Sequence, residues 1–212
     1  MGNIQKTNDF NEIVLGRRSI KTYDPNVKIS REELSAILEK ASRAPSSVNM
    51  QPWRFLVIDT EEGKNKLAPL APFNGSQVET SAAVIAVFAD MQNIDFMEEI
   101  TAKSVELGYM PQEVRDMMLT NFKPKLEGLS KNELSHNNLI DAGLVSMQFM
   151  LVARSHGYDT NPMGGYEKSR IAEVFGLDEE RFLPVMIISI GKAAIEGHPS
   201  YRLPLEKTTV WA

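Results

Sequence analysis

The feature that most constrains this fold is a nearly continuous apolar stretch over residues 139–153. Ser130 and Glu133 have the spacing of a capping box, which predicts that one long helix begins there and ends near His156-Gly157. The stretch is interrupted by polar residues and is too short to span a bilayer. A helix that is apolar on most sides has to be covered, so we expect it in the core or in a subunit interface.

The remaining segments predict an alternation of helices and strands within one domain. We expect buried strands over 53–58, 82–89 and 185–190 and a short strand over 158–161. Helices are expected over 9–15, 30–44, 61–70 and 166–175, the second beginning with a further capping box at Ser30 and Glu33. Neither a repeat nor a low-complexity linker divides the chain, so residues 1–212 are predicted to form a single domain.

Composition excludes several kinds of chemistry. The 212 residues contain no cysteine, which removes zinc–thiolate sites, iron–sulfur ligation by cysteine and thiol nucleophiles. The three histidines lack the spacing of metal ligands, so no metal site is expected. The net charge of −5 argues against a nucleic-acid partner. Residues 1–7 lack the apolar core of a signal peptide, so we expect a cytoplasmic protein with no membrane partner.

A basic cluster near the start is unusual in an acidic chain. Arg17, Arg18, Ser19 and Lys21 place three cations and a hydroxyl within five residues. Such a group can surround a phosphate, because arginine offers forked donors and lysine a point charge. Taken alone, the cluster is also typical of a solvated helix end. Arg202, near the other end, is either a second phosphate ligand or a surface charge.

Two loops could hold a neutral ligand. Pro45 to Pro52 is a stiff loop in which Ser46, Ser47 and Asn49 offer uncharged donors and acceptors, as a heteroaromatic ring requires. Pro162-Met163-Gly164-Gly165 permits close approach of a ligand to the backbone. The alternatives are an ordinary helix-to-strand connection and a tight strand-to-helix turn, respectively.

The C-terminal tail, residues 198–212, ends with Val210 and Trp211. Chain ends are usually polar and frayed. Two large apolar residues there indicate that the tail docks either on this core or on a partner subunit.

Taken in order, these segments resemble the FMN-dependent nitroreductase family. The similarity covers residues 17–23, residues 44–53, Asn74, the segment Pro162-Met163-Gly164-Gly165, and residues 202–204. It implies an α+β fold with a mixed, mostly antiparallel sheet flanked by helices. It further implies an intertwined homodimer that exchanges the tail 198–212 and holds two FMN molecules at its interface.

The resemblance also implies a set of cofactor-binding residues. They are Arg17, Arg18, Ser19, Lys21, Pro45, Ser46, Ser47, Asn49, Asn74, Gln77, Pro162, Met163, Gly164, Gly165 and Arg202. Arg17, Ser19 and Arg202 would bind the phosphate and ribityl groups. Ser46, Ser47 and Asn49 would come from the other subunit.

At the flavin ring, the resemblance places Asn74 and Lys21 near the pyrimidine edge and the Gly165 amide near N5. Lys21 and Gly165 would tune the flavin electronically, and no side chain is required as a catalyst. Gln77 stands where some members have a second lysine, and Gly164 where some have glutamate. Both departures concern residues that would affect the redox potential of the flavin and the preference for a substrate.

The activity implied is ping-pong hydride transfer from NADH or NADPH through FMN to a small-molecule acceptor, such as a nitroaromatic or a quinone. Enone reduction or dehalogenation on the same scaffold is an alternative, and so is a non-catalytic flavin-binding module. Residues 91–129 either cover the substrate or form a helical hairpin packed for stability.

Overall fold

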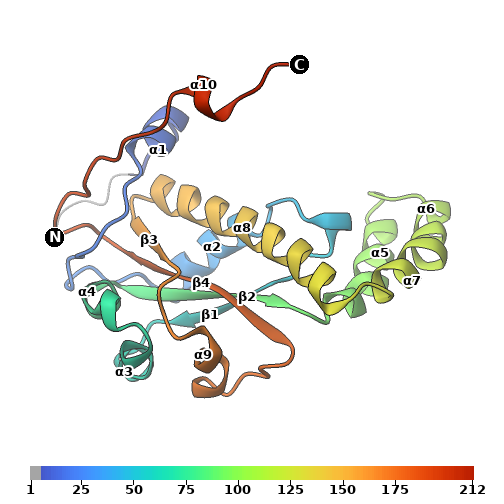
Figure 1. Ribbon diagram of the computed structural model, residues 1–212, viewed down its shortest axis with the longest axis horizontal. Coiled ribbons are helices and arrows are strands. Elements are labelled where there is room, and N and C mark those ends of the chain that lie inside the picture. Colours follow the sequence, from blue (N-terminus) through green and yellow to red (C-terminus); the bar gives the residue numbers. More distant parts are fainter. Residues whose placement is uncertain (1–5) are drawn as a thin grey trace.

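The computed structural model describes residues 6–212 and is built on one four-stranded sheet (Figure 1). Its strands are β1 (Trp53–Ile58), β2 (Ala83–Asp90), β3 (Asp159–Met163) and β4 (Phe182–Gly191). They lie in the order β1-β2-β4-β3, and neighbours are antiparallel. An isolated parallel bridge joins Ser19 to Thr160. The expected α+β fold is therefore confirmed. The expectation about a signal peptide falls largely on residues 1–5, which lie outside the described part.

Helices cover both faces of the sheet (Figure 1). On one face α2 (Arg31–Ala41) and α8 (Lys131–Ser155) pack against β2 and β4. On the other face lie α3 (Glu61–Leu67), α4 (Gly75–Thr80) and α9 (Lys168–Val174). All eight residues of β2 are buried, because this central strand has a neighbour on each side and helices on each face.

The long predicted helix is α8, and the capping box at Ser130 and Glu133 is formed. Its inner face places Val145 and Phe149 in the core. Its outer face leaves Ile140 65% and Leu144 43% exposed. One side of the helix thus lies in the core, and the other apolar side is uncovered within this chain.

A third cluster of apolar residues lies apart from the sheet. It joins the short helix Ser47–Asn49 to the helices between β2 and α8. Those helices are Asn93–Phe96, α5 (Met97–Glu106), α6 (Gln112–Met117), the π-helical turn Met118–Phe122 and α7 (Lys123–Glu127). Met50, Met97 and Met118 form its buried centre. The helical character expected for 91–129 is therefore confirmed.

The first and last helices of the chain lie beyond α8, away from the sheet (Figure 1). They are α1 (Phe10–Gly16) and α10 (Leu205–Thr208). Val210 is 92% exposed and Trp211 86%. Docking of the tail on its own core, one of the two alternatives, is wrong. Within residues 6–212, none of the helices has the length and hydropathy needed to cross a membrane.

Several predicted boundaries differ from the structure. The second predicted helix ends at Ala41 and the fourth covers only Lys168–Val174, while the last strand extends over 182–191. The helix from Glu61 ends at Leu67 and continues as a 3-10 turn, since Pro69 lacks the amide that an α-helix needs. Pro162 and Met163 were expected in a turn but belong to β3. A proline is tolerated there because β3 is an edge strand.

The capping box at Ser30 is only half formed. Ser30 Oγ accepts from the Glu33 amide at 3.1 Å, as expected. The Glu33 carboxylate instead contacts Lys6 Nζ at 3.0 Å and His156 Nδ1 at 2.8 Å. His156 is buried and its Nε2 lies 2.7 Å from Lys40 Nζ, which confirms a structural role for this histidine. Contacts with residues distant in sequence therefore replace the bond that the Glu33 carboxylate would make to the Ser30 amide in a complete capping box.

Candidate functional site

The basic cluster contains a buried donor without an acceptor. Arg17 follows α1 directly, and its Nη1 is buried with no hydrogen-bond partner among residues 6–212. Desolvation lowers the pKa of Arg17, and repulsion from Arg202 and Arg18 lowers it further. A buried guanidinium nitrogen without an acceptor is costly, and a bound anion would satisfy it.

The other two arginines of the cluster donate to residues near them in the sequence. Arg18 Nη1 donates to the carbonyls of Leu15 at 2.6 Å and Arg17 at 2.9 Å. Arg202 Nη1 donates to Ser200 Oγ at 2.6 Å and to the Tyr201 carbonyl at 3.2 Å. The charge of Arg202 acts on Arg17, so the fold brings the tail arginine near the N-terminal cluster.

The tail reaches this cluster by a close backbone approach. A Cβ added to Gly197 would lie 2.5 Å from Arg18 Cβ and 3.0 Å from Ile20 Cδ1. Any side chain at this position would push the tail away from Arg18. Glycine here thus helps to place Arg202 beside Arg17.

Ser19 and Lys21 follow the arginines along the edge of the sheet. Ser19 bridges to Thr160 of β3, and both Ser19 and Lys21 are exposed. Thr160 Oγ1 is a second buried polar atom without a partner in the described part. No signal in the sequence marks Thr160, because threonine is common in strands.

The end of β3 leads to the predicted ring-binding glycines. Asn74 Nδ2 donates to the Gly165 carbonyl at 2.9 Å, and Gln77 Nε2 donates to Asn74 Oδ1 at 3.3 Å. A Cβ on Gly164 or Gly165 would meet no atom within 4 Å. The structure thus joins Asn74, Gln77 and the glycines, and leaves open space beside the glycine backbone.

The loop from Pro45 to Gln51 is strained. Val48, Asn49 and Gln51 have φ values of 51°, 58° and 44°. Left-handed backbone costs a non-glycine residue about 1–3 kcal/mol, and it is most unusual for a β-branched one such as Val48. Such strain persists only where surrounding contacts enforce it, and it occurs most often at functional sites.

Asp141 holds the start of this loop. The Ser47 amide donates to Asp141 Oδ1 at 3.1 Å and Oδ2 at 3.0 Å, and the Gln51 amide donates to Ser46 Oγ at 3.0 Å. Burial raises the pKa of Asp141, and the bond from the Ser47 amide opposes that rise. Reading the sequence missed this role, since Asp141 interrupts the apolar helix without any motif.

Within a single chain, the loop 45–51 lies away from the arginine cluster. Ser47 contacts Asp141 of α8, whereas a Cβ on Gly16 would lie 3.3 Å from Arg154 of the same helix. The two contact points are thirteen helical residues apart, or about 20 Å at ~1.5 Å per residue. A second copy would be needed to bring the loop to the arginines, consistent with the assignment of Ser46, Ser47 and Asn49 to the other subunit. The cofactor roles of all these residues stay predictions.

Comparison with known proteins places the chain in a family. The model of the Nitroreductase family matches residues 14–192. A Bacillus subtilis protein, YdgI, provisionally named an NAD(P)H nitroreductase, is 65% identical over 206 residues, covering 97% of this chain and 99% of its own. A crystal structure from Exiguobacterium sibiricum, of a provisional nitroreductase in complex with FMN, has a TM-score of 0.96 at 61% identity and covers 98% of this chain and 99% of its own.

A third relative bears a more specific name. The CLA biosynthesis enone reductase of Lactiplantibacillus plantarum is 38% identical over 190 residues. The alignment covers 89% of this chain and 88% of that enzyme.

Proposed function

Because this chain belongs to the nitroreductase family, we propose that it is an oxidoreductase that binds FMN and uses NADH or NADPH to reduce a small organic acceptor, such as a nitroaromatic or a quinone. The observation that supports this most directly is Arg17, whose buried Nη1 lacks an acceptor beside the charges of Arg18 and Arg202. The FMN phosphate would supply that acceptor and balance the positive charge.

The residues fit the two ends of the proposed cofactor. Arg17, Arg202 and Ser19 would bind the phosphate and the ribityl hydroxyls. Asn74 fixes the backbone at Gly165, and the open space beside Gly164 and Gly165 admits a flat ring. Lys21 would place a positive charge at the pyrimidine edge, where it favours the reduced flavin. When bound, FMN supplies the hydride-transfer chemistry, so that the chain itself provides position and charge.

We propose that the site is completed in a homodimer. The outer face of α8 and the tail leave large apolar side chains uncovered within one chain, including Ile140, Leu144 and Trp211. Burial against a second copy would remove them from water. The same arrangement would bring the loop 45–51 of one subunit to the arginines of the other. It also makes residues 91–129, which pack on that loop, a cover for the acceptor. The cytoplasm is the proposed location.

Enone reduction is the second candidate activity. It is favoured by the 38% identity to a relative named as an enone reductase. The two candidates differ in the acceptor: in one case hydride reaches a nitro group or a quinone, in the other a carbon–carbon double bond conjugated to a carbonyl.

The purified protein tests the proposal directly. We expect a yellow protein whose flavin absorbance is bleached anaerobically by NADH or NADPH. A nitroaromatic, a quinone and an enone are then added separately, and the acceptor that restores the colour fastest identifies the activity. A flavin that neither nicotinamide bleaches would indicate a binding module without turnover. A colourless protein that takes up no added FMN would refute the proposal.

A further inference from the structure

The strained loop and the helices after β2 form one structural unit. Met50 of the loop packs with Met97 and Met118, and the partly buried Val48 joins the same cluster. This cluster is separate from the two cores that cover the sheet. A displacement of the loop would therefore also displace the helices of residues 93–127, and a displacement of these helices would move the loop.

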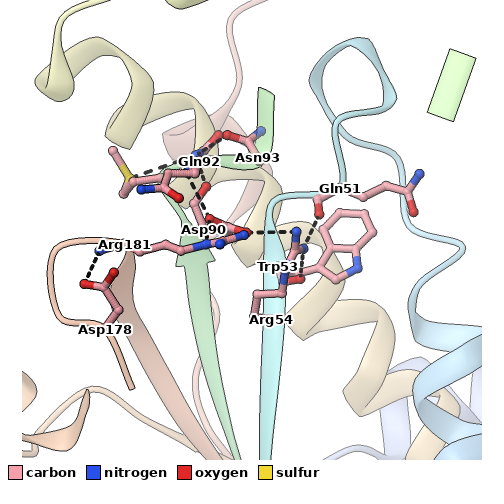
Figure 2. Close-up of polar contacts among 10 residues, drawn as sticks. Gln51, Trp53, Arg54, Asp90, Gln92, Asn93, Asp178 and Arg181 are labelled. Carbon is pink, nitrogen blue, oxygen red and sulfur yellow. Dashed lines mark hydrogen bonds and ion pairs between the residues drawn. The ribbon is translucent and has the colours of Figure 1, made fainter. Parts of the chain in front are cut away.

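The end of this loop is held by Arg54 of β1 (Figure 2). Arg54 Nη1 donates to the carbonyls of Gln51 at 3.0 Å and Trp53 at 2.8 Å. Its other nitrogen, Nη2, lies 2.9 Å from Asp90 Oδ2. The guanidinium also lies over the Phe96 ring, 4.9 Å from its centroid, which ties it to the unit described above.

Asp90 fixes the orientation of Arg54. Its carboxylate is fully buried and accepts from Arg181 Nε and Nη2, each at 2.9 Å (Figure 2). Asn138 of α8 donates to the Asp90 carbonyl and to Asn93 Oδ1, both at 3.1 Å. One carboxylate therefore joins β1 and β2 to the residue that immediately precedes β4, and Asp90 is joined in turn to the helix that carries Asp141.

The loop is thus clamped at both ends by charged side chains. Asp141 accepts from the Ser47 amide at its start, and Arg54 donates to the Gln51 carbonyl at its end. Between them lie all three left-handed, non-glycine residues that the described chain contains. Strained backbone of this kind relaxes unless contacts on each side prevent it.

We propose that Asp141 and Arg54 are positioning residues for the cofactor site: they hold the loop 46–51 in the conformation, left-handed at Val48, Asn49 and Gln51, that presents Ser46, Ser47 and Asn49 to the flavin of a second copy of this chain. This inference rests on the proposed function. The clamp stabilises a shape that the loop would not adopt alone, and so the site is organised before the cofactor arrives.

A matched pair of conservative variants tests the Arg54 end. Arg54→Lys keeps a positive charge near Asp90 but replaces the rigid guanidinium fork by a single nitrogen, which cannot occupy both the place of Nη1 at the loop carbonyls and that of Nη2 at the carboxylate. Arg181→Lys makes the same change on the same carboxylate, yet Arg181 donates nothing to the loop. Hydrogen exchange of the 47–51 amides and titration of the cofactor-free dimer with FMN are measured for both variants.

We expect Arg54→Lys to speed exchange in the loop and to weaken FMN binding about tenfold, the size expected when one charged hydrogen bond no longer holds the backbone. Arg181→Lys should change FMN affinity less than about twofold even where its thermal stability falls equally. Equal loss of affinity in both variants would overturn the inference, because any weakening of the Asp90 network would then suffice.

Asp141→Asn tests the other end and separates positioning from stability. Asparagine keeps a side-chain oxygen that can accept from the Ser47 amide and removes a buried charge, so at neutral pH the melting temperature of the variant should change little. FMN affinity should fall nonetheless, because the Ser47 amide loses a charged acceptor. Parallel loss of melting temperature and affinity would indicate a merely structural residue and would overturn the inference.

The two proposals fail in different ways. If the unmodified protein binds no FMN, the proposed function is wrong, while the exchange rates still report on the clamp. If the unmodified protein binds FMN and both loop variants bind it equally well, the positioning role alone is wrong.

Discussion

Replacing Arg17 by methionine should have opposite effects on two quantities, the stability of the cofactor-free protein and its affinity for FMN. The change keeps an unbranched side chain of similar length and removes the guanidinium. In the cofactor-free protein, Arg17 Nη1 is buried without a partner and lies near two like charges. The variant should therefore be more stable than the unmodified protein when FMN is absent.

The structure sets the size of that gain. An unsatisfied buried donor costs about 1–3 kcal/mol. We take the low end, since the rest of the Arg17 side chain is only half buried. For a chain of this length about 1 kcal/mol corresponds to a rise of roughly 2–4 °C in melting temperature.

Binding should change in the opposite direction. Hydrogen bonds to a charged group contribute about 1.5–3 kcal/mol each, so losing two at the phosphate costs about 3 kcal/mol or more. That corresponds to a dissociation constant for FMN roughly a hundredfold higher. Inorganic phosphate should raise the melting temperature of the unmodified protein and leave that of the variant unchanged.

Thermal unfolding with and without FMN, together with quenching of flavin fluorescence on binding, measures both effects. The matched control is Arg170→Met, which removes an exposed arginine of α9 whose one ion pair within residues 6–212 is with Glu167. A cofactor-free Arg17→Met protein that melts lower and binds FMN as tightly as before would refute the reasoning, because Arg17 would then be a structural donor.

Three further predictions concern other parts of the molecule. Lys21→Met should lower the flavin potential and slow reduction by NAD(P)H; an unchanged potential in an anaerobic redox titration would refute its electronic role. Ending the chain at Thr209 removes Val210 and Trp211, which are exposed in one chain, so the proposed dimer should dissociate about tenfold or more readily in sedimentation while the fold stays intact. Bonds from His156 and Lys6 lower the pKa of Glu33, so its contribution to stability is present above pH 4.5 and is lost at lower pH. Glu33→Gln should flatten the acid limb of denaturant unfolding, and an identical limb would contradict this.

Family and element order could be predicted from the sequence because their signals are local or ordered along the chain. The 25 residues of α8 and its capping box follow from residue types within a few turns. Of the residues proposed for the site, the arginine cluster and Asn74 were predicted from the sequence, whereas Asp141, Arg54 and Asp90 were not. These three act through partners distant in sequence, and no spacing rule connects them.

The sequence by itself determined where the helices and strands lie and which cofactor they suit, since periodicity, capping and ordered motifs are properties of neighbouring residues. Only the tertiary structure decided which charges meet. It placed Arg202 near Arg17, and it paired the Glu33 carboxylate with His156 instead of with the N-terminal cap of its own helix. It also fixed the loop 46–51 through Asp141 at its start and Arg54 at its end. The physical reason is that contacts between charges depend on which segments the folded backbone brings together in space, and separation along the chain does not record that proximity.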